Sequence, residues 1–232
     1  MSYYDHFAAQ STTRAGRWVK RHARQRQLAR ILPFLPDRLS AILEIGPGFG
    51  ELADLFQEAG YRNYTAVEPN GLMRERLEQR GIKTKSYSLP YLEEEDRSYD
   101  AIVLFHVFEH LNGNHEARLF LSEARRVLRL QGLLCILAPD YLHCGRDFFN
   151  VDYTHNNVTT VRRASQLFQD NGFRPVDWAY FSGLFSGPLA TLVSTLVRYA
   201  LFFSSGNNLA DRLYKVKTSF LRSFLMTGRL EL

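Results

Sequence analysis

The middle of the sequence alternates short apolar runs with longer segments in which apolar residues recur at helical spacing. The apolar runs predict six strands, at residues 41–45, 63–68, 82–87, 100–105, 133–138 and 174–181. The segments between them predict helices near residues 50–59, 71–80, 114–130 and 159–171. Strands that alternate with helices are typical of parallel β-α-β units, so the pattern predicts a doubly wound, mainly parallel α/β sheet.

Four glycines lie between a predicted helix and the strand that follows it: Gly60, Gly81, Gly132 and Gly172. The residue after the end of a helix commonly adopts a left-handed backbone, which costs glycine little. We therefore expect all four glycines to end helices, which supports the alternating pattern.

The pattern changes after the sixth strand. Residues 183–217 are aromatic, aliphatic and basic, with a turn expected at "SSGNN" (204–208), and the closing "SFLMTGRLEL" predicts an antiparallel strand. That strand would be the seventh of a Rossmann-like sheet. We expect three parts: a basic helical arm (1–40), a Rossmann-like domain (41–182) and an apolar, basic helical elaboration with the closing strand (183–232).

The most apolar stretch, residues 183–203, has the length of a membrane span but is interrupted by Pro188 and Arg198. About 16 residues remain after the proline, fewer than the roughly 20 that cross a bilayer. Thr191, Ser194, Thr195 and Arg198 form one narrow polar stripe at helical spacing. We expect a helix buried on most sides or lying in a membrane interface, and no span.

The net charge of +5 arises from one segment: residues 14–30 contain seven Lys or Arg and no acidic residue. One interpretation is the solvated face of an N-terminal helix; the other is a patch for a phosphorylated substrate, an anionic membrane or nucleic acid. Cys135 and Cys144 are too few for a disulfide framework, which indicates a reducing, cytoplasmic setting. Peripheral attachment to the inner face of the membrane is compatible with both observations.

The stretch "LEIGPGFGEL" (43–52) joins the first strand to the first helix of the sheet through a glycine-rich turn. Such a turn brings backbone N–H groups close to a ligand. Its G-x-G-x-G spacing differs from the dinucleotide fingerprint, and Glu44 and Glu51 would disfavour a pyrophosphate. A ligand with a positive amino group and a sulfonium fits better, and Glu68 follows the second strand where a carboxylate can accept ribose hydroxyls.

Four motifs in order resemble class I S-adenosylmethionine-dependent methyltransferases of the small-molecule type. They are "LEIGPGFGEL", "YTAVEPN" (64–70), "LPYLEEEDRSYDAIVLFHVFEHL" (89–111) and "EARRVLRLQGLLCILAPD" (123–140). The resemblance covers residues 41 to about 181 and implies an enzyme with S-adenosylmethionine as its cofactor.

The resemblance also implies which residues bind the cofactor. The glycine turn would enclose the methionine end with Glu44 near its amino group, Glu68 would hold the ribose, and Phe105 and His106 would lie along the cofactor. Lys85 stands where the family often has an acidic residue for adenine, so we expect Ser86 and Tyr87 to hold the adenine instead. The full set of expected cofactor residues is Glu44, Gly46, Pro47, Gly48, Phe49, Gly50, Glu68, Pro69, Ser86, Tyr87, Phe105 and His106.

Two histidine groups are candidates for catalysis: "HVFEH" (106–110) after the fourth strand and "DYTH" (152–155) after the fifth. Histidine suits a general base for a hydroxyl acceptor, and an aspartate can orient it. We predict His155, oriented by Asp152, as the base; His106 and His110 are the alternatives, although Glu109 and His110 also fit a packing role. Because His106 replaces the first glutamate of a segment that binds a divalent metal in some quinone-type relatives, we expect no metal ion.

Three functions stay open from the sequence. The first is O-methylation of a hydroxyl on a glycan, glycolipid or secondary metabolite, so that the partner is a small-molecule, sugar or lipid-linked acceptor. The second is RNA methylation with the basic arm, which the "FHVF" after the fourth strand disfavours because it lacks an N/D-P-P-Y tetrapeptide. The third is a scaffold subunit without activity. A homodimer and an anionic membrane surface are further expected partners.

Overall fold

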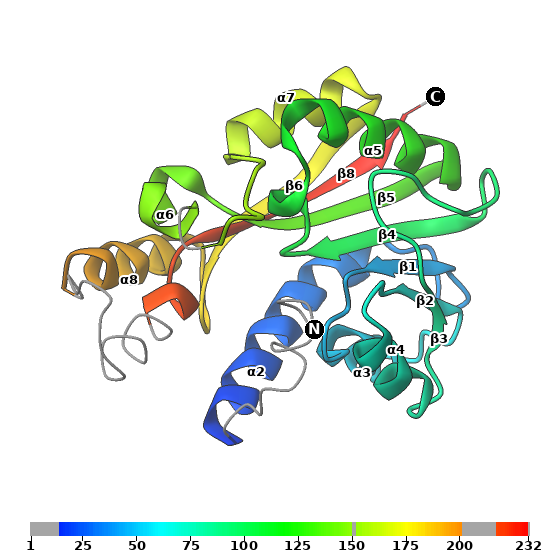
Figure 1. The fold of residues 1–232 in the computed structure, drawn as a ribbon, viewed down its shortest axis with the longest axis horizontal. Helices are drawn as coiled ribbons and strands as arrows, with labels where there is room; N and C mark the ends of the chain where they lie inside the picture. Colours follow the sequence, from blue (N-terminus) through cyan, green and yellow to red (C-terminus); the bar gives the residue numbers. More distant parts are fainter. Residues whose placement is uncertain (1–13, 150–151, 201–216, 232) are drawn as a thin grey trace.

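The computed structural model describes residues 14–149, 152–200 and 217–231 (Figure 1). The expected turn at 204–208, the cations Arg212 and Lys215, and the first 13 residues of the basic arm lie outside these ranges. The helices are α2 (Arg14–Ile31), η1 (Leu32–Phe34), α3 (Glu51–Glu58), α4 (Gly71–Glu78), η2 (Phe108–His110), α5 (Gly113–Val127), α6 (Tyr141–Phe149), α7 (Val161–Asp170) and α8 (Gly187–Ala200). The strands are β1 (Ile42–Ile45), β2 (Tyr64–Val67), β3 (Lys83–Lys85), β4 (Tyr99–Phe105), β5 (Leu128–Pro139), β6 (Phe173–Ser182), β7 (Phe185–Ser186) and β8 (Ser223–Leu230).

The strands form one sheet in the order β3-β2-β1-β4-β5-β8-β6-β7. The pairs from β3 to β5 are parallel, and β8 runs antiparallel between β5 and β6. The doubly wound, mainly parallel sheet and the antiparallel closing strand are therefore confirmed. The expected number of seven strands is one too low, because the chain after β6 turns back immediately and pairs Phe185 and Ser186 with it as β7.

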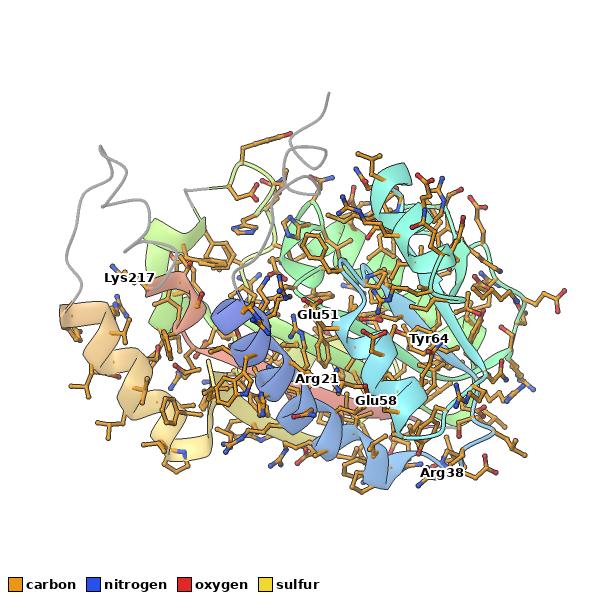
Figure 2. The ribbon with its side chains drawn as sticks, turned by 90° about the horizontal axis from the view of Figure 1, so that it is seen from below. Arg21, Arg38, Glu51, Glu58, Tyr64 and Lys217 are labelled. Carbon is orange, nitrogen blue, oxygen red and sulfur yellow. The ribbon has the colours of Figure 1, made fainter. Side chains whose placement is uncertain are left out.

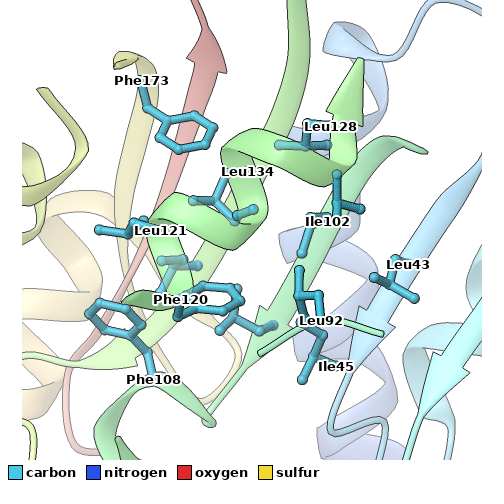
Figure 3. Packing of buried hydrophobic residues seen from close by; sticks show 14 of the residues in the cluster. Leu43, Ile45, Leu92, Ile102, Phe108, Phe120, Leu121, Leu128, Leu134 and Phe173 are labelled. Atoms are coloured by element: carbon cyan, nitrogen blue, oxygen red, sulfur yellow. The ribbon is translucent and has the colours of Figure 1, made fainter. Parts of the chain in front are cut away.

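Helices cover both faces of the sheet, as Figure 1 shows: α5 and α7 lie on one face and α2, α3 and α4 on the other. Each face has its own apolar core. Figure 3 shows part of the first core, in which Phe120 and Leu121 of α5 pack on Ile102 of β4 and Leu134 of β5. Central strands covered on both faces need continuous apolar runs, which explains why the sequence marked β1, β4 and half of β5 clearly.

Three of the four glycines expected to end helices do so. Gly60, Gly81 and Gly172 follow α3, α4 and α7 with φ of 93°, 74° and 83°. The expectation for Gly132 is wrong, because α5 ends at Val127 and Gly132 lies inside β5. Residues 128–130 were expected to be helical, but Leu128 pairs with Tyr99 as strand, with a register shift before Ala101.

Of the two placements expected for α8, burial on most sides is wrong. Ser194 in its polar stripe is fully buried, whereas Leu189, Leu192, Leu196 and Tyr199 are exposed. The described residues contain no helix that is both long and apolar enough to cross a membrane.

The basic helix α2 packs beside α3, and Figure 2 shows Arg21 next to Glu58 of that helix. Arg21 Nη2 donates to Glu58 Oε2 over 2.6 Å, and Arg30 Nε donates to Asp177 Oδ2 over 2.8 Å. These two cations therefore attach the arm to the rest of the protein. Helix α2 is part of the fold.

Candidate active site

A cleft of about 1020 Å³ opens at the carboxyl ends of β1, β2 and β4. This is the position at which open α/β sheets bind ligands, and the volume suits a nucleoside cofactor together with an acceptor. The cleft walls come from α2, the glycine turn, the ends of β2 and β4, α6, the loop at 152–155 and residues 218–223.

The glycine turn has a backbone that only glycine adopts at low cost. Gly46, Gly48 and Gly50 have φ of 68°, 55° and 76°. A side chain at Gly46 would lie 2.4 Å from Val107 Cγ2, whereas Gly48 has open space in front of it. The turn thus leaves its backbone exposed to a ligand at Gly48, and the cleft is lined by Gly46, Pro47, Gly48 and Phe49 as the sequence predicted. Gly50 is buried behind it, at the start of α3.

Glu68 lies at the end of β2 and lines the cleft together with Pro69. Its Oε1 accepts a hydrogen bond of 2.9 Å from the backbone N–H of Asn70, and its side chain also receives one from the backbone of Gly48. Burial raises its pKa, and the two backbone hydrogen bonds oppose that rise. The carboxylate is therefore held firmly beside the glycine turn.

Glu44 lies beneath the turn rather than among the residues that line the cleft. It is buried and accepts a hydrogen bond from the hydroxyl of Tyr64. Burial raises its pKa to about 8, and the Arg24 guanidinium opposes that rise. A second positive charge in the cleft would favour the ionised form of Glu44 in the same way.

Arg24 of α2 reaches into the cleft and was not among the residues expected from the sequence. Its guanidinium carbon lies 5.0 Å from the ring centre of Phe105. Burial lowers its pKa, and the carboxylates of Glu51, Glu44 and Glu109 oppose that effect. The only sequence signal was a basic residue on a helix near the first strand, which does not distinguish Arg24 from its six basic neighbours.

At the far end of the cofactor region the cleft is lined by Tyr87, Ser88, Leu89, Met73 and Asn70. Ser86 is exposed and does not line the cleft, so the structure places Tyr87 but not Ser86 at this end. The basic residue at the position where the family often has an acidic one has its own partner: Lys85 Nζ lies 2.6 Å from Glu94 Oε2 and so belongs to a separate ion pair.

His106 ends β4 in a left-handed conformation with φ of 60°. A residue other than glycine adopts this backbone at a cost, and such residues often lie at functional sites. His106 Nδ1 lies 3.3 Å from Glu109 Oε1, and Glu109 is almost fully buried. Burial raises the pKa of Glu109, but the hydrogen bond and charge of His106 and the charge of His110 outweigh burial, so that its pKa is lowered.

The loop at 152–155 meets η2 at the acceptor end of the cleft. The hydroxyl of Thr154 donates to Asp152 Oδ1 over 2.6 Å, and His110 Nδ1 lies 2.7 Å from the same hydroxyl. The rings of His110 and His155 lie 4.8 Å apart. The structure therefore brings together His106, His110, Asp152 and His155, which the sequence placed in two separate groups.

His155 is held by Phe148 rather than by Asp152. Its ring stacks on Phe148 at 4.8 Å with an angle of 12°, and its Nδ1 lies 3.3 Å from the Phe148 carbonyl oxygen. Its Nε2 lies 3.9 Å from Asp152 Oδ2, too far for a hydrogen bond. The expected orientation of His155 by Asp152 is thus replaced by orientation through Phe148, and Asp152 acts on the imidazole through its charge.

Glu109, His110 and His155 each offer a ligand atom, and these atoms lie within 4.8 Å of one another. Carboxylate and imidazole ligands suit a divalent transition metal, so these three residues could hold one. Glu109 Oε2 is buried and has no hydrogen-bond partner. The sequence did not reveal this grouping, because His155 lies far from the other two in the chain.

The two cysteines of the chain are buried and free, as expected for small apolar side chains. Cys144 lines the cleft, and burial raises its pKa to about 12. A thiol with that pKa is protonated at neutral pH and is a poor nucleophile. Cys135 lies within β5, and burial raises its pKa to about 12 as well.

A glycine turn that exposes its backbone, a carboxylate at the end of β2 and an antiparallel strand next to β5 define the class of S-adenosylmethionine-dependent methyltransferases. The sequence matches the family described as a methyltransferase domain over residues 20–177, and the chain belongs to that family. The expected class and its cofactor, S-adenosylmethionine, are confirmed. No curated protein matches the sequence.

Solved structures share the fold at low sequence identity. A chain from the complex of the Haloferax volcanii Trm112 methyltransferase activator with a methyltransferase candidate has a TM-score of 0.72 at 14% identity, with coverage of 100% of this chain and 99% of that one. A candidate sarcosine dimethylglycine methyltransferase from Galdieria sulphuraria has a TM-score of 0.65 at 16% identity, with 97% and 90% covered. An S-adenosylmethionine-dependent methyltransferase from Archaeoglobus fulgidus has a TM-score of 0.62 at 17% identity, with 98% and 100% covered.

Proposed function

We propose that the protein transfers a methyl group to a hydroxyl of a glycan, glycolipid or related secondary metabolite. The observation that carries this proposal is His155, an imidazole that lines the cleft beyond the cofactor region with a carboxylate 3.9 Å from its Nε2. A hydroxyl acceptor benefits from a base with a pKa near neutrality, and histidine is the side chain that fits.

When bound, the cofactor supplies an electrophilic methyl group. The chain holds the cofactor with the glycine turn and Glu68, and Phe148 holds the ring of His155. If Nδ1 carries the proton and donates it to the Phe148 carbonyl, Nε2 is free to take the proton of the acceptor hydroxyl. Asp152 then stabilises the resulting imidazolium by its charge. The neighbouring His110 has a lowered pKa because it is buried, although the charge of Glu109 opposes this shift. The imidazole of His110 is therefore more readily neutral.

The lining of the acceptor end supports a polyhydroxylated acceptor. Asn112, Glu116, Thr218 and Ser219 contribute polar groups, and Phe148 contributes an aromatic ring. Polar groups fix the orientation of a ligand, while an aromatic wall offers apolar contact. A sugar presents both kinds of surface.

The experiment that tests the proposal is His155→Gln, measured by methyl transfer to a panel of glycan and glycolipid acceptors. We expect turnover to fall about 10²–10⁴-fold while cofactor affinity changes little. The control is His143→Gln, because His143 is half-buried and does not line the cleft. Retention of activity within a few-fold would show that the loop is structural, and a severe loss in His106→Gln alone would assign the base to the end of β4.

A chelator separates a base from a metal ligand at the same residue. We expect wild-type activity to survive treatment with EDTA, because a base needs no cation. Loss of activity that Zn²⁺, Mn²⁺ or Mg²⁺ restores would instead assign His155, His110 and Glu109 to a metal site.

RNA methylation is the second candidate, and the basic helix α2 favours it. However, Arg21 and Arg30 pair with Glu58 and Asp177, and Arg24 lies in the cleft. Fewer cations of the helix are thus left for phosphates than the sequence suggested. Labelled cofactor with total RNA, with and without a Trm112-type activator, distinguishes the candidates: incorporation into RNA would support this one and contradict the first.

A further inference from the structure

Helix α8 has a polar face toward the protein and an apolar face toward the outside. Thr191, Ser194 and Arg198 recur at i, i+3 and i+7, and this stripe faces inward. Leu189, Leu192, Leu196 and Tyr199 recur at i, i+3, i+7 and i+10, and their exposed fractions are 49%, 56%, 60% and 71%. An amphipathic helix on a globular protein normally has the reverse arrangement.

A buried ion pair explains why the polar face turns inward. Arg222 lies beneath α8, where its Nε donates to Asp140 Oδ2 over 3.0 Å and its Nη1 donates to Thr191 Oγ1 over 3.0 Å. At the end of the helix, Arg198 Nη1 donates to the carbonyl oxygen of Leu142 over 3.1 Å. Rotation of the helix to bury its leucines would remove the Thr191 hydroxyl from Arg222 Nη1 and leave part of a buried guanidinium without its hydrogen bond, which is costly. The outward apolar face is therefore built into the fold.

The exposed surface extends beyond the helix itself. Leu142 of α6 is 67% exposed, and its carbonyl holds Arg198. We call Leu142, Leu189, Leu192, Leu196 and Tyr199 the α8 face. An exposed group of large apolar side chains on one surface marks an interaction site.

We propose that the α8 face binds the surface of an anionic lipid bilayer. The described residues from 178 to 230 contain no acidic side chain. Lys217 lies on this side of the molecule (Figure 2), and Arg198 belongs to α8 itself. Arg198 lies 5.9 Å from the ring centre of Tyr199, so a cation and an interfacial aromatic residue occur together. Leucines, a tyrosine and cations without acids are typical of helices that lie in the interface of an anionic membrane.

The part of the α8 face that the structure describes, five side chains, suits a bilayer better than a second copy of the chain. At roughly 100 Å² of exposed surface for each side chain, its five residues offer about 500 Å². A specific protein interface needs about 800 Å² from each partner. A bilayer has no such minimum, because binding increases with each apolar side chain and each cation that reaches the interface.

The α8 face lies near the acceptor end of the cleft. Helices α6 and α8 lie side by side in Figure 1, and Phe148 of α6 lines the acceptor end of the cleft. A bilayer on the α8 face would therefore lie near the acceptor end. The docking itself does not depend on the acceptor, so it is tested separately from the proposed activity.

Flotation of the full-length protein with vesicles tests the proposal. Vesicles of phosphatidylcholine alone are compared with vesicles that contain phosphatidylglycerol, at low and high salt. We expect flotation only with phosphatidylglycerol, with a loss at high salt. In Leu192→Gln/Leu196→Gln we expect the vesicle-bound fraction at a given lipid concentration to fall about tenfold or more.

The matched control is Leu39→Gln/Leu130→Gln, which removes two leucines that are also exposed but lie at the amino ends of β1 and β5, away from α8. Circular dichroism and cofactor binding establish that both variants are folded. Equal flotation of the two variants, or none by the wild type, would overturn the proposal. So would a dimer in solution that dissociates only in the Leu192→Gln/Leu196→Gln variant, because the α8 face would then be a protein interface.

Discussion

At the scale of single residues, the cleft contains residues whose backbone conformation or burial costs folding free energy. His106 keeps a left-handed backbone, and Glu109 and Glu44 are buried carboxyl groups. Neighbours hold all three residues in place. The backbone N–H of His106 donates to the Leu137 carbonyl over 2.8 Å, the His106 ring lies against Glu109, and the Tyr64 hydroxyl donates to Glu44. Such residues indicate a surface shaped for binding, because a fold selected for stability alone would avoid them.

Glu68→Ala tests the cofactor region directly. We expect the affinity for S-adenosylmethionine and its demethylated product to fall by about 1.5–3 kcal/mol, since the variant loses a carboxylate that accepts ribose hydroxyls. Calorimetry measures this, and Glu75→Ala is the control because Glu75 is exposed and lies outside the cleft. Unchanged affinity in Glu68→Ala would contradict the assignment of this residue to the ribose.

The raised pKa of Glu44 makes the free energy of unfolding depend on pH. Its pKa rises from 4.5 to about 8 on folding, so between these values the folded protein keeps a proton that the unfolded chain releases. Folding stability from this group is complete below pH 4.5, decreases as the pH rises and is lost by about pH 8. In Glu44→Gln the side chain does not titrate, so this fall in stability with pH is absent, and the amide oxygen still accepts a hydrogen bond from Tyr64. We therefore expect the variant to gain stability relative to wild type between pH 5 and pH 8, by about 1–4 kcal/mol.

Chemical unfolding of the cofactor-free protein at several pH values checks this expectation. Glu75→Gln, at an exposed position, is expected to follow the wild type at every pH. Parallel profiles for Glu44→Gln and wild type would mean that Glu44 is ionised in the folded protein at neutral pH.

Most residues that the sequence assigned to the cofactor line the cleft, because they belong to short motifs that directly follow β1, β2, β3 and β4. Arg24 lines the cleft without having been assigned to it, and Ser86 does not line it, since neither the direction of a helix face nor the exact end of a strand can be read from local spacing. The relation of His155 to its neighbours was also wrong in detail. Phe148 provides its carbonyl and its ring, and no local pattern distinguishes it from other phenylalanines.

At the scale of elements, α2 forms a wall of the cleft through Arg24 and Lys20, and the match to the methyltransferase family begins inside this helix, at residue 20. Arg24 is a cation beside the carboxylates of Glu51 and Glu109. The methionine end of the cofactor carries both a carboxylate and positive charges, so Arg24 is suited to the former and the glutamates to the latter.

Arg24→Met is therefore expected to weaken cofactor binding about 10- to 100-fold, as for loss of a hydrogen bond to a charged group. Equilibrium binding of the demethylated product measures the effect without catalysis. Arg26→Met is the matched control, because Arg26 is exposed on the same helix and lies outside the cleft. Tighter binding in Arg24→Met would show that Arg24 competes with the cofactor for the glutamates.

The sequence of α8 does not determine which of its faces packs against the protein. Its periodicity correctly indicated one polar and one apolar face, but not which face the protein covers. That choice depends on Asp140 and Arg222, which lie in other parts of the chain and meet beneath the helix. The limits of α5 were misjudged for a related reason: Leu128 becomes strand because Tyr99 offers it a partner across the sheet.

At the scale of the whole molecule, the order of helices and strands was enough to predict the class of fold. The alternation of apolar runs and helices leaves few arrangements other than a parallel sheet with helices on both faces. The composition of the acceptor end was harder to predict, because residues from α6, the loop at 152–155 and the segment 218–223 meet there only after folding.

The place of β8 has a consequence for how the protein forms during translation. Residues 223–230 lie between β5 and β6, so both of those strands leave the ribosome before the strand that joins them. Until then, each offers an unpaired edge to other nascent chains. The part from β1 to β5 can assemble early, whereas β6, β7 and α8 must wait with their apolar surfaces uncovered. A chaperone that binds nascent chains is therefore expected to bind mainly after β6 has been synthesised and before β8 has.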